Sequence, residues 1–140
     1  MKTTSAYLQP LPPEKTLCVY QDDTLIFSSK GKWLYPIFEL EDFLSSYKGK
    51  QDCLQIHDTA IGKGAVVLLL RLGVKAIHGD LVSSLAKEYV ESYIADTSQV
   101  VVFSYQKLVP KLLCATEELF ADETDGTKMY NELQRRAKRI

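Results

Sequence analysis

The sequence predicts an α/β fold built on a mixed sheet of about five strands. Short β-favouring runs alternate with helical patterns of about ten residues, which is typical of βαβ crossovers and a parallel sheet. Ahead of them, residues 16–31 read as an antiparallel hairpin that turns at Asp22 and Asp23, a residue type that tolerates tight turns. The sheet should therefore combine parallel and antiparallel pairs.

Length and charge narrow the class of protein. A chain of 140 residues with 46% hydrophobic residues is the size of one domain with a sizeable core, so we expect a single domain over 1–140. Lys and Arg number 17 against 18 Asp and Glu, which leaves a net charge of −1. Such a balance supplies no general attraction for nucleic acid or an anionic membrane, and we expect neither partner.

The three cysteines, Cys18, Cys53 and Cys114, are odd in number, widely separated and without a Cys-x-x-Cys pair. This pattern argues against a disulfide framework or a thiolate zinc site and favours buried, reduced thiols. The N-terminus lacks the apolar core of a signal peptide, and no apolar run reaches the roughly 18 residues of a membrane span. We therefore expect a cytoplasmic protein.

The elements follow in order along the chain. Pro10, Pro12 and Pro13 predict an extended N-terminal arm over residues 1–14, ahead of a core over 15–120. Apolar residues at helical spacing after Pro36 predict a helix that ends near "YKGK". "CLQIH", residues 53–57, reads as a strand, and "VVLLLRLG", residues 66–73, as a helix that is apolar on every side and needs cover beyond the sheet.

The second half repeats the alternation. "VKAIHG" predicts a strand over 74–79, Ser83 or Ser84 caps an amphipathic helix, and "QVVVFSY" predicts a strand over 99–105. A bent or short helical segment is expected around Pro110. Residues 121–140 read as a polar linker and a final helix whose "RRAKR" either complements the helix dipole or touches RNA phosphates.

Two loops lie where an α/β sheet binds ligands, beyond the carboxyl ends of strands. They are "SSKGKWLYP" after the hairpin and "HDTAIGKG" after the strand that ends at His57. If the strands before them are neighbours, the loops face each other across a crevice. The predicted ligand-binding residues are then Ser28, Ser29, Gly31, Tyr35, Asp58, Gly62, Lys63 and Gly64.

The second loop has the composition of an anion site. Gly62 and Gly64 permit close backbone approach, a helix N-terminus offers unpaired N–H groups, and Lys63 adds a positive charge. We expect a small anionic or nucleotide-like ligand and no cofactor. If a reaction follows, Asp58 is the general base and Lys63 the electrostatic stabiliser, since they are the suitable charged pair.

Each of these residues also has a structural interpretation. Asp58 can satisfy backbone N–H groups in a turn, and Lys63 can pair with Asp58 in solvent. Trp33 and Tyr35 either stack on a planar ligand or cover the mouth of the core. The full Gly-x-x-x-x-Gly-Lys-Ser/Thr spacing of a phosphate loop is missing, so ATP hydrolysis is not supported.

A metal site is conceivable at the strand ends, where His57 and His78 lie beside Asp58 and Asp80. The spacing matches no compact ligand motif, and a histidine can simply form a hydrogen bond at a strand end. The sequence therefore predicts no metal.

The stretch "HDTAIGKGAVVLLLRLGVKAIHGDLVSSLAKEYV" and the Ser-x-Gly-x…Pro run before the first helix resemble DUF1893, a small prokaryotic family of unknown function. The likeness covers residues 16–120; "KLLCATEELFADET" departs from the Arg- and Cys-Pro-containing end of the family. The resemblance implies a cytidine-deaminase-like three-layer α/β/α sandwich. Zinc deaminases carry His-x-Glu and Cys-x-x-Cys at two helix starts. Here the corresponding residues are Tyr35 to Ile37 and Gly62 to Ala65, so deaminase chemistry is not expected.

The rival hypothesis is a protein-interaction or scaffold module in which the crevice is vestigial. An exposed apolar patch together with a filled crevice would favour it. Whether the protein is an enzyme stays open at this point, as does homo-oligomerisation.

Overall fold

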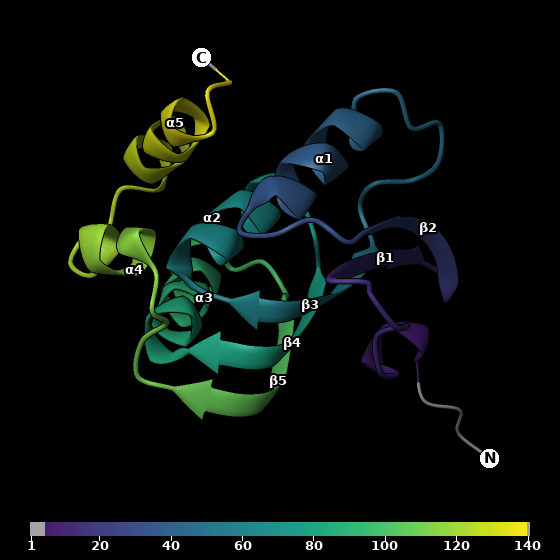
Figure 1. The fold of residues 1–140 in the computed structure, drawn as a ribbon, viewed down its shortest axis with the longest axis horizontal. Helices are drawn as coiled ribbons and strands as arrows, with labels where there is room; N and C mark the ends of the chain where they lie inside the picture. Colours follow the sequence, from purple (N-terminus) through teal and green to yellow (C-terminus); the bar gives the residue numbers. More distant parts are fainter. Residues whose placement is uncertain (1–4, 140) are drawn as a thin grey trace.

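The computed structural model describes residues 5–139 and contains one mixed sheet of five strands in the order β2-β1-β3-β4-β5 (Figure 1). The predicted α/β class and the mixed sheet are confirmed. The strands are β1 (Leu17–Gln21), β2 (Thr24–Ser29), β3 (Leu54–Ile61), β4 (Ala76–Ser83) and β5 (Val102–Val109). The helices are η1, a 3-10 turn (Ala6–Leu8), α1 (Tyr35–Leu44), α2 (Lys63–Arg71), α3 (Ser84–Thr97), α4 (Ala115–Phe120) and α5 (Gly126–Arg136).

Strand directions decide which loops meet. β1 runs antiparallel to both β2 and β3, while β3, β4 and β5 are parallel. The carboxyl ends of β2 and β3 therefore lie at the same edge, although β1 separates the two strands. The loops that follow β2 and β3 were expected to face each other if these strands were neighbours. They do lie at the same end of the sheet, but β1 stands between the two strands.

Local sequence signals explain the turns and caps. Asp22 and Asp23 have positive φ angles of 50° and 64°, as the tight hairpin requires. Pro36 lies in the first turn of α1. The Ser83 side chain accepts a hydrogen bond from the N–H of Ala86 and caps α3. Asp125 caps α5 in the same way, by accepting from the N–H groups of the second and third residues of the helix.

Helix α2 lies at the centre of the molecule. Every residue from Lys63 to Leu70 is buried, as the continuously apolar pattern predicted. The helix contacts β3 and all four of the other α-helices, which supply the cover that the sequence required (Figure 1). Met129 and Leu133 of α5 are fully buried in the same core, so the final helix is part of the hydrophobic core rather than an appendage to it.

On the opposite face of the sheet, the N-terminal arm packs against β1 and β3. Ile56 points into the helical layer, and the next residue, His57, contacts the carbonyl of Tyr7 on the other side. The arm, predicted to be extended, contains η1, in which Tyr7 is buried. Proline fixes the chain only from residue 10 onward, and burial of Tyr7 orders the turn before it. Residues 1–4 of the predicted arm lie outside the described residues.

The strands are longer than predicted. β3 was expected to end at His57 but continues to Ile61, because Asp58 pairs with both β1 and β4, and Ala60 and Ile61 pair with β4. Most of the predicted loop "HDTAIGKG" is therefore strand. Cys53, expected within a buried strand, lies just before β3 and is exposed.

Within residues 5–139, none of the helices combines the length and apolar character needed to cross a bilayer.

Candidate functional site

A cleft of about 510 Å³ opens at the carboxyl end of β3, between the loop before α1 and the segment before α4. This is the edge of the sheet where α/β folds bind ligands. The residues that line it are Thr16, Gly31, Lys32, Trp33, Leu34, Pro36, Asp58, Thr59, Ala60, Gly62, Gly64, Ala65, Leu112, Leu113, Cys114, Thr116 and Glu117.

Asp58 lies at the base of the cleft and is 9% exposed. Burial raises the pKa of its carboxyl group to about 7, and the negative charge of Asp80 acts in the same direction. Hydrogen bonds to the backbone of Thr59 and Ala60 and to the Thr59 hydroxyl oppose the shift without cancelling it. At neutral pH this carboxyl is therefore divided between its protonated and ionised forms.

An aromatic pair stands at the mouth of the cleft. Trp33 is 39% exposed and has a φ of 58°, a left-handed conformation that is uncommon for a bulky residue. Tyr35 packs edge-on against it, with ring centroids 5.1 Å apart, but does not line the cleft. Leu113, on the opposite rim, is fully exposed. Trp33 and Leu113 therefore leave apolar surface exposed to solvent at the rim of the cleft.

Lys63, predicted to hold a ligand in the crevice, is not among the residues that line this cleft. Its side chain is buried and turns away, so that its Nζ donates hydrogen bonds to the carbonyls of Phe120 at 2.8 Å and Glu123 at 2.5 Å. Burial lowers the pKa of the ammonium group; the nearby carboxylates of Glu123, Asp122 and Glu117 act in the opposite direction. The expected pairing of Lys63 with Asp58 is likewise absent from the hydrogen bonds and ion pairs of residues 5–139.

The anion expected at the start of α2 is supplied by the chain itself. Glu117, 1% exposed, accepts hydrogen bonds from the N–H of Lys63 at 2.8 Å and of Leu112 at 3.1 Å. Gly62 permits this approach, because a Cβ there would lie 3.0 Å from the Glu117 carboxylate. The sequence analysis did not identify Glu117. Glu117 and Glu118 are adjacent in the short helix α4, and nothing in the local sequence shows that one is a buried cap and the other is exposed to solvent.

The structure brings together half of the predicted ligand-binding residues. Gly31, Asp58, Gly62 and Gly64 line the cleft, whereas Ser28, Ser29, Tyr35 and Lys63 do not. Ser29 is a structural residue: its Oγ donates to Glu39 at 3.0 Å and accepts from the N–H of Gly31 at 3.1 Å.

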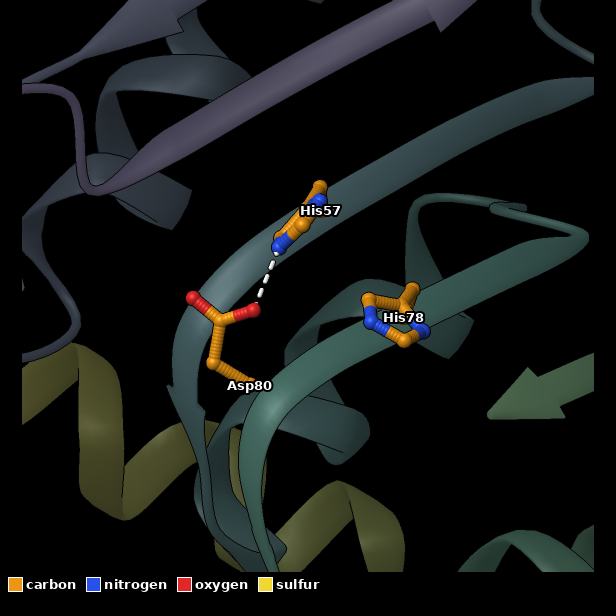
Figure 2. Close-up of side chains that lie close together, drawn as sticks. All are labelled: His57, His78 and Asp80. Atoms are coloured by element: carbon orange, nitrogen blue, oxygen red, sulfur yellow. Dashed lines mark hydrogen bonds and ion pairs between the residues drawn. The ribbon is translucent and has the colours of Figure 1, made fainter. Parts of the chain in front are cut away.

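A second cluster, His57, His78 and Asp80, lies on the opposite face of the sheet (Figure 2). The Nε2 atom of His57 is 2.7 Å from Oδ1 of Asp80. The Nδ1 atom of His57 lies 3.0 Å from the carbonyl oxygen of Tyr7, and Nδ1 of His78 lies 2.8 Å from Oγ of Ser104. Desolvation and the neighbouring His57 lower the pKa of His78, while Asp80 opposes the shift.

Comparisons with known proteins agree with the fold. The crystal structure of a DUF1893 family protein (TM1506) from Thermotoga maritima is similar, with a TM-score of 0.72 and 23% sequence identity over 88% of this chain and 81% of that chain. This likeness shows a shared fold. No curated protein matches the chain significantly. A family model described as a domain of unknown function, DUF1893, matches residues 9–136. Since that match spans most of the sequence, the chain belongs to the DUF1893 family.

Proposed function

We propose that this protein binds a small, planar, nucleotide-like ligand through its base, in the cleft at the carboxyl end of β3. The observation that carries the proposal is Asp58, a carboxyl group held at the base of a largely apolar cleft. A ring that bears N–H donors would form hydrogen bonds to this group and recover the solvation that burial removes. Trp33 at the mouth is placed to cover the face of such a ring.

The charge of the cleft favours the base of the ligand over its phosphate. Asp58 and Glu117 are acidic, and Lys32 supplies the positive charge among the described lining residues. The N-terminal turn of α2, where an anion was expected, already binds the carboxylate of Glu117. A free phosphate therefore has less to gain in this cleft than an uncharged hydrogen-bond donor.

The finer fold assignment, a cytidine-deaminase-like sandwich, belongs to the same proposal and rests on the family resemblance. At the starts of α1 and α2, where deaminases hold zinc, this chain carries Tyr35 to Ile37 and Gly62 to Ala65. Those side chains include no metal-binding group other than the tyrosine. We therefore propose binding without zinc deaminase chemistry in the cleft.

The test is a calorimetric titration with free nucleobases, nucleosides and inorganic phosphate. Wild type should bind a base or nucleoside and show no response to phosphate. Asp58→Asn, which keeps the shape of the carboxyl, should weaken binding about tenfold or more, because an ionised acceptor forms stronger hydrogen bonds than an amide. Trp33→Asn should also weaken it, since asparagine tolerates the left-handed backbone while removing the ring.

Asp96→Asn on α3 is the matched control, because it makes the same change at an exposed position away from the cleft. It should bind as wild type does. Equal affinity in all variants, or no binding by a folded protein, would reject the cleft as a ligand site. That result would support the interaction-module alternative, for which β5 offers an outer edge with Val102, Tyr105 and Leu108 exposed.

A further inference from the structure

The cluster of His57, His78 and Asp80 has no part in the cleft, because it lies on the other face of the sheet. His57 and His78 are paired across neighbouring strands β3 and β4, and Asp80 lies two residues after His78 on the same face. One potential ligand atom from each residue falls within 4.8 Å of the others. Tertiary pairing has therefore assembled two imidazoles and a carboxylate, a donor set whose spacing in the sequence matches no compact ligand motif.

Both histidines are already oriented by a second partner. The Tyr7 carbonyl accepts from Nδ1 of His57, so that nitrogen carries a proton, and the Ser104 hydroxyl holds Nδ1 of His78. Each ring is left with Nε2 for the cluster, and Figure 2 shows a ring nitrogen of His57 directed at Asp80. Histidines that bind metals are usually fixed in this way, with the other ring nitrogen hydrogen-bonded to a carbonyl or another polar group.

The contact between Nε2 of His57 and Oδ1 of Asp80 requires a proton or a metal ion between the two atoms. Because Nδ1 of His57 is protonated toward Tyr7, a neutral ring would present the lone pair of Nε2 to the Asp80 carboxylate at 2.7 Å. Two lone pairs repel at that distance, so a proton or a metal ion must lie between the atoms. In the metal-free protein that proton joins His57, whose side chain is only 3% exposed, to Asp80.

We propose that His57, His78 and Asp80 bind one divalent transition metal ion through the two Nε2 atoms and a carboxylate oxygen. Imidazole ligands favour zinc, iron or cobalt over magnesium and calcium. Bond lengths of about 2.1 Å at a tetrahedral centre separate the ligand atoms by about 3.4 Å, so Asp80 must withdraw from His57 by less than about 1 Å. Asp80 can do so because its side chain is 37% exposed.

Three protein ligands leave a coordination position toward solvent on the exposed side of Asp80. Sites with three protein ligands and an open position characteristically hold a water molecule or a substrate atom. The metal would also stabilise the N-terminal arm, since His57 connects the site to the Tyr7 carbonyl. This expectation reverses the prediction from sequence that the protein binds no metal.

The experiment uses tag-free full-length chain with Cys53→Ser, because the exposed Cys53 thiol is a competing ligand. After chelator treatment, the protein is titrated with Zn²⁺ by calorimetry and with Co²⁺ by visible absorption. The chain has two histidines, so nitrogen NMR reports on these two rings alone. We expect one metal ion per chain, a visible Co²⁺ spectrum with nitrogen ligands and a shift of both Nε2 signals.

Three variants distinguish this site from nonspecific binding. Asp80→Asn preserves shape and should reduce metal affinity by more than tenfold, and Ser104→Ala by about tenfold through its effect on His78. The exposed control Asp96→Asn should change affinity less than twofold. Should Asp80→Asn fail to fold, His78→Gln provides the same comparison. Unchanged Nε2 signals, no saturation at one equivalent, or equal affinity across the variants would overturn the proposal, whatever the outcome of ligand binding in the cleft.

Discussion

Lys63 and Glu117 cap each other's helices. The main-chain N–H of Lys63, at the start of α2, donates to Glu117 at 2.8 Å, and the Lys63 ammonium group donates to the Phe120 carbonyl at the end of α4, also at 2.8 Å. A carboxylate thus lies at one helix's N-terminus and a cation at another's C-terminus, both favourable placements relative to the helix dipoles. Residues 54 apart in the chain thereby fix α4 against α2 and form one wall of the cleft.

Glu117→Gln should destabilise the protein by about 1.5–3 kcal/mol, because one of the two buried N–H groups would face an amide NH₂ in place of a carboxylate oxygen. Urea unfolding followed by circular dichroism measures the change. The control is Glu118→Gln, whose side chain is 68% exposed and paired only with Lys111 at the surface. It should change stability by less than about 1 kcal/mol. Equal effects of the two substitutions would contradict the capping role.

Lys63→Ala should lower the free energy of unfolding by about 1–3 kcal/mol, since the buried carbonyl of Phe120 would lose its lysine donor. Denaturant titrations of Lys63→Ala and the more exposed Lys111→Ala make the comparison, and we expect only the first to be destabilised markedly. A Lys63→Ala protein of wild-type stability would show that these contacts contribute nothing.

Asp58 should make stability depend on pH between about 4 and 7. The folded carboxyl has a pKa of about 7, whereas its ordinary value is 3.8, so the folded state binds more protons in that interval and its stability falls as pH rises. The full penalty, up to about 4 kcal/mol, applies above pH 7. Asp58→Asn should therefore exceed wild type in stability at pH 8 and match it near pH 4.

Melting temperatures of Asp58→Asn and wild type across this range test the prediction, with Asp96→Asn as the control for loss of an exposed carboxylate. A constant difference between Asp58→Asn and wild type at every pH would show that Asp58 titrates normally in the folded protein.

The rate at which a thiol reagent labels each cysteine should follow the exposure of its side chain. Cys53 is exposed and should react within the mixing time of a native assay, while Cys18 is fully buried within β1. Burial also raises the pKa of the Cys18 thiol, which reduces the reactive thiolate fraction. Mass spectrometry of the labelled chain identifies the order. Labelling of Cys18 as fast as Cys53 would mean that the hairpin does not pack as described.

Much of the fold could be predicted because its signals are local. The hairpin turn at Asp22 and Asp23, the Ser83 cap and the buried helix after Gly62 each depend on a few adjacent residues with strong conformational preferences. The position of the cleft also followed from the sequence, since the carboxyl ends of strands define it. Gly31, Asp58, Gly62 and Gly64 were correctly expected to line it.

What the sequence by itself determined is therefore the alternation of strands and helices, the mixed sheet and the edge at which the loops meet. Tertiary structure alone decided the direction of the Lys63 side chain, because a buried carbonyl 57 residues away, that of Phe120, accepts a hydrogen bond from its ammonium group. It also decided that Glu117 occupies the anion position at α2 and that His57, His78 and Asp80 share one site. The periodicity of apolar residues indicates which face of a helix or strand is buried. It does not indicate which residues pack against that face, because those residues come from segments distant in the sequence.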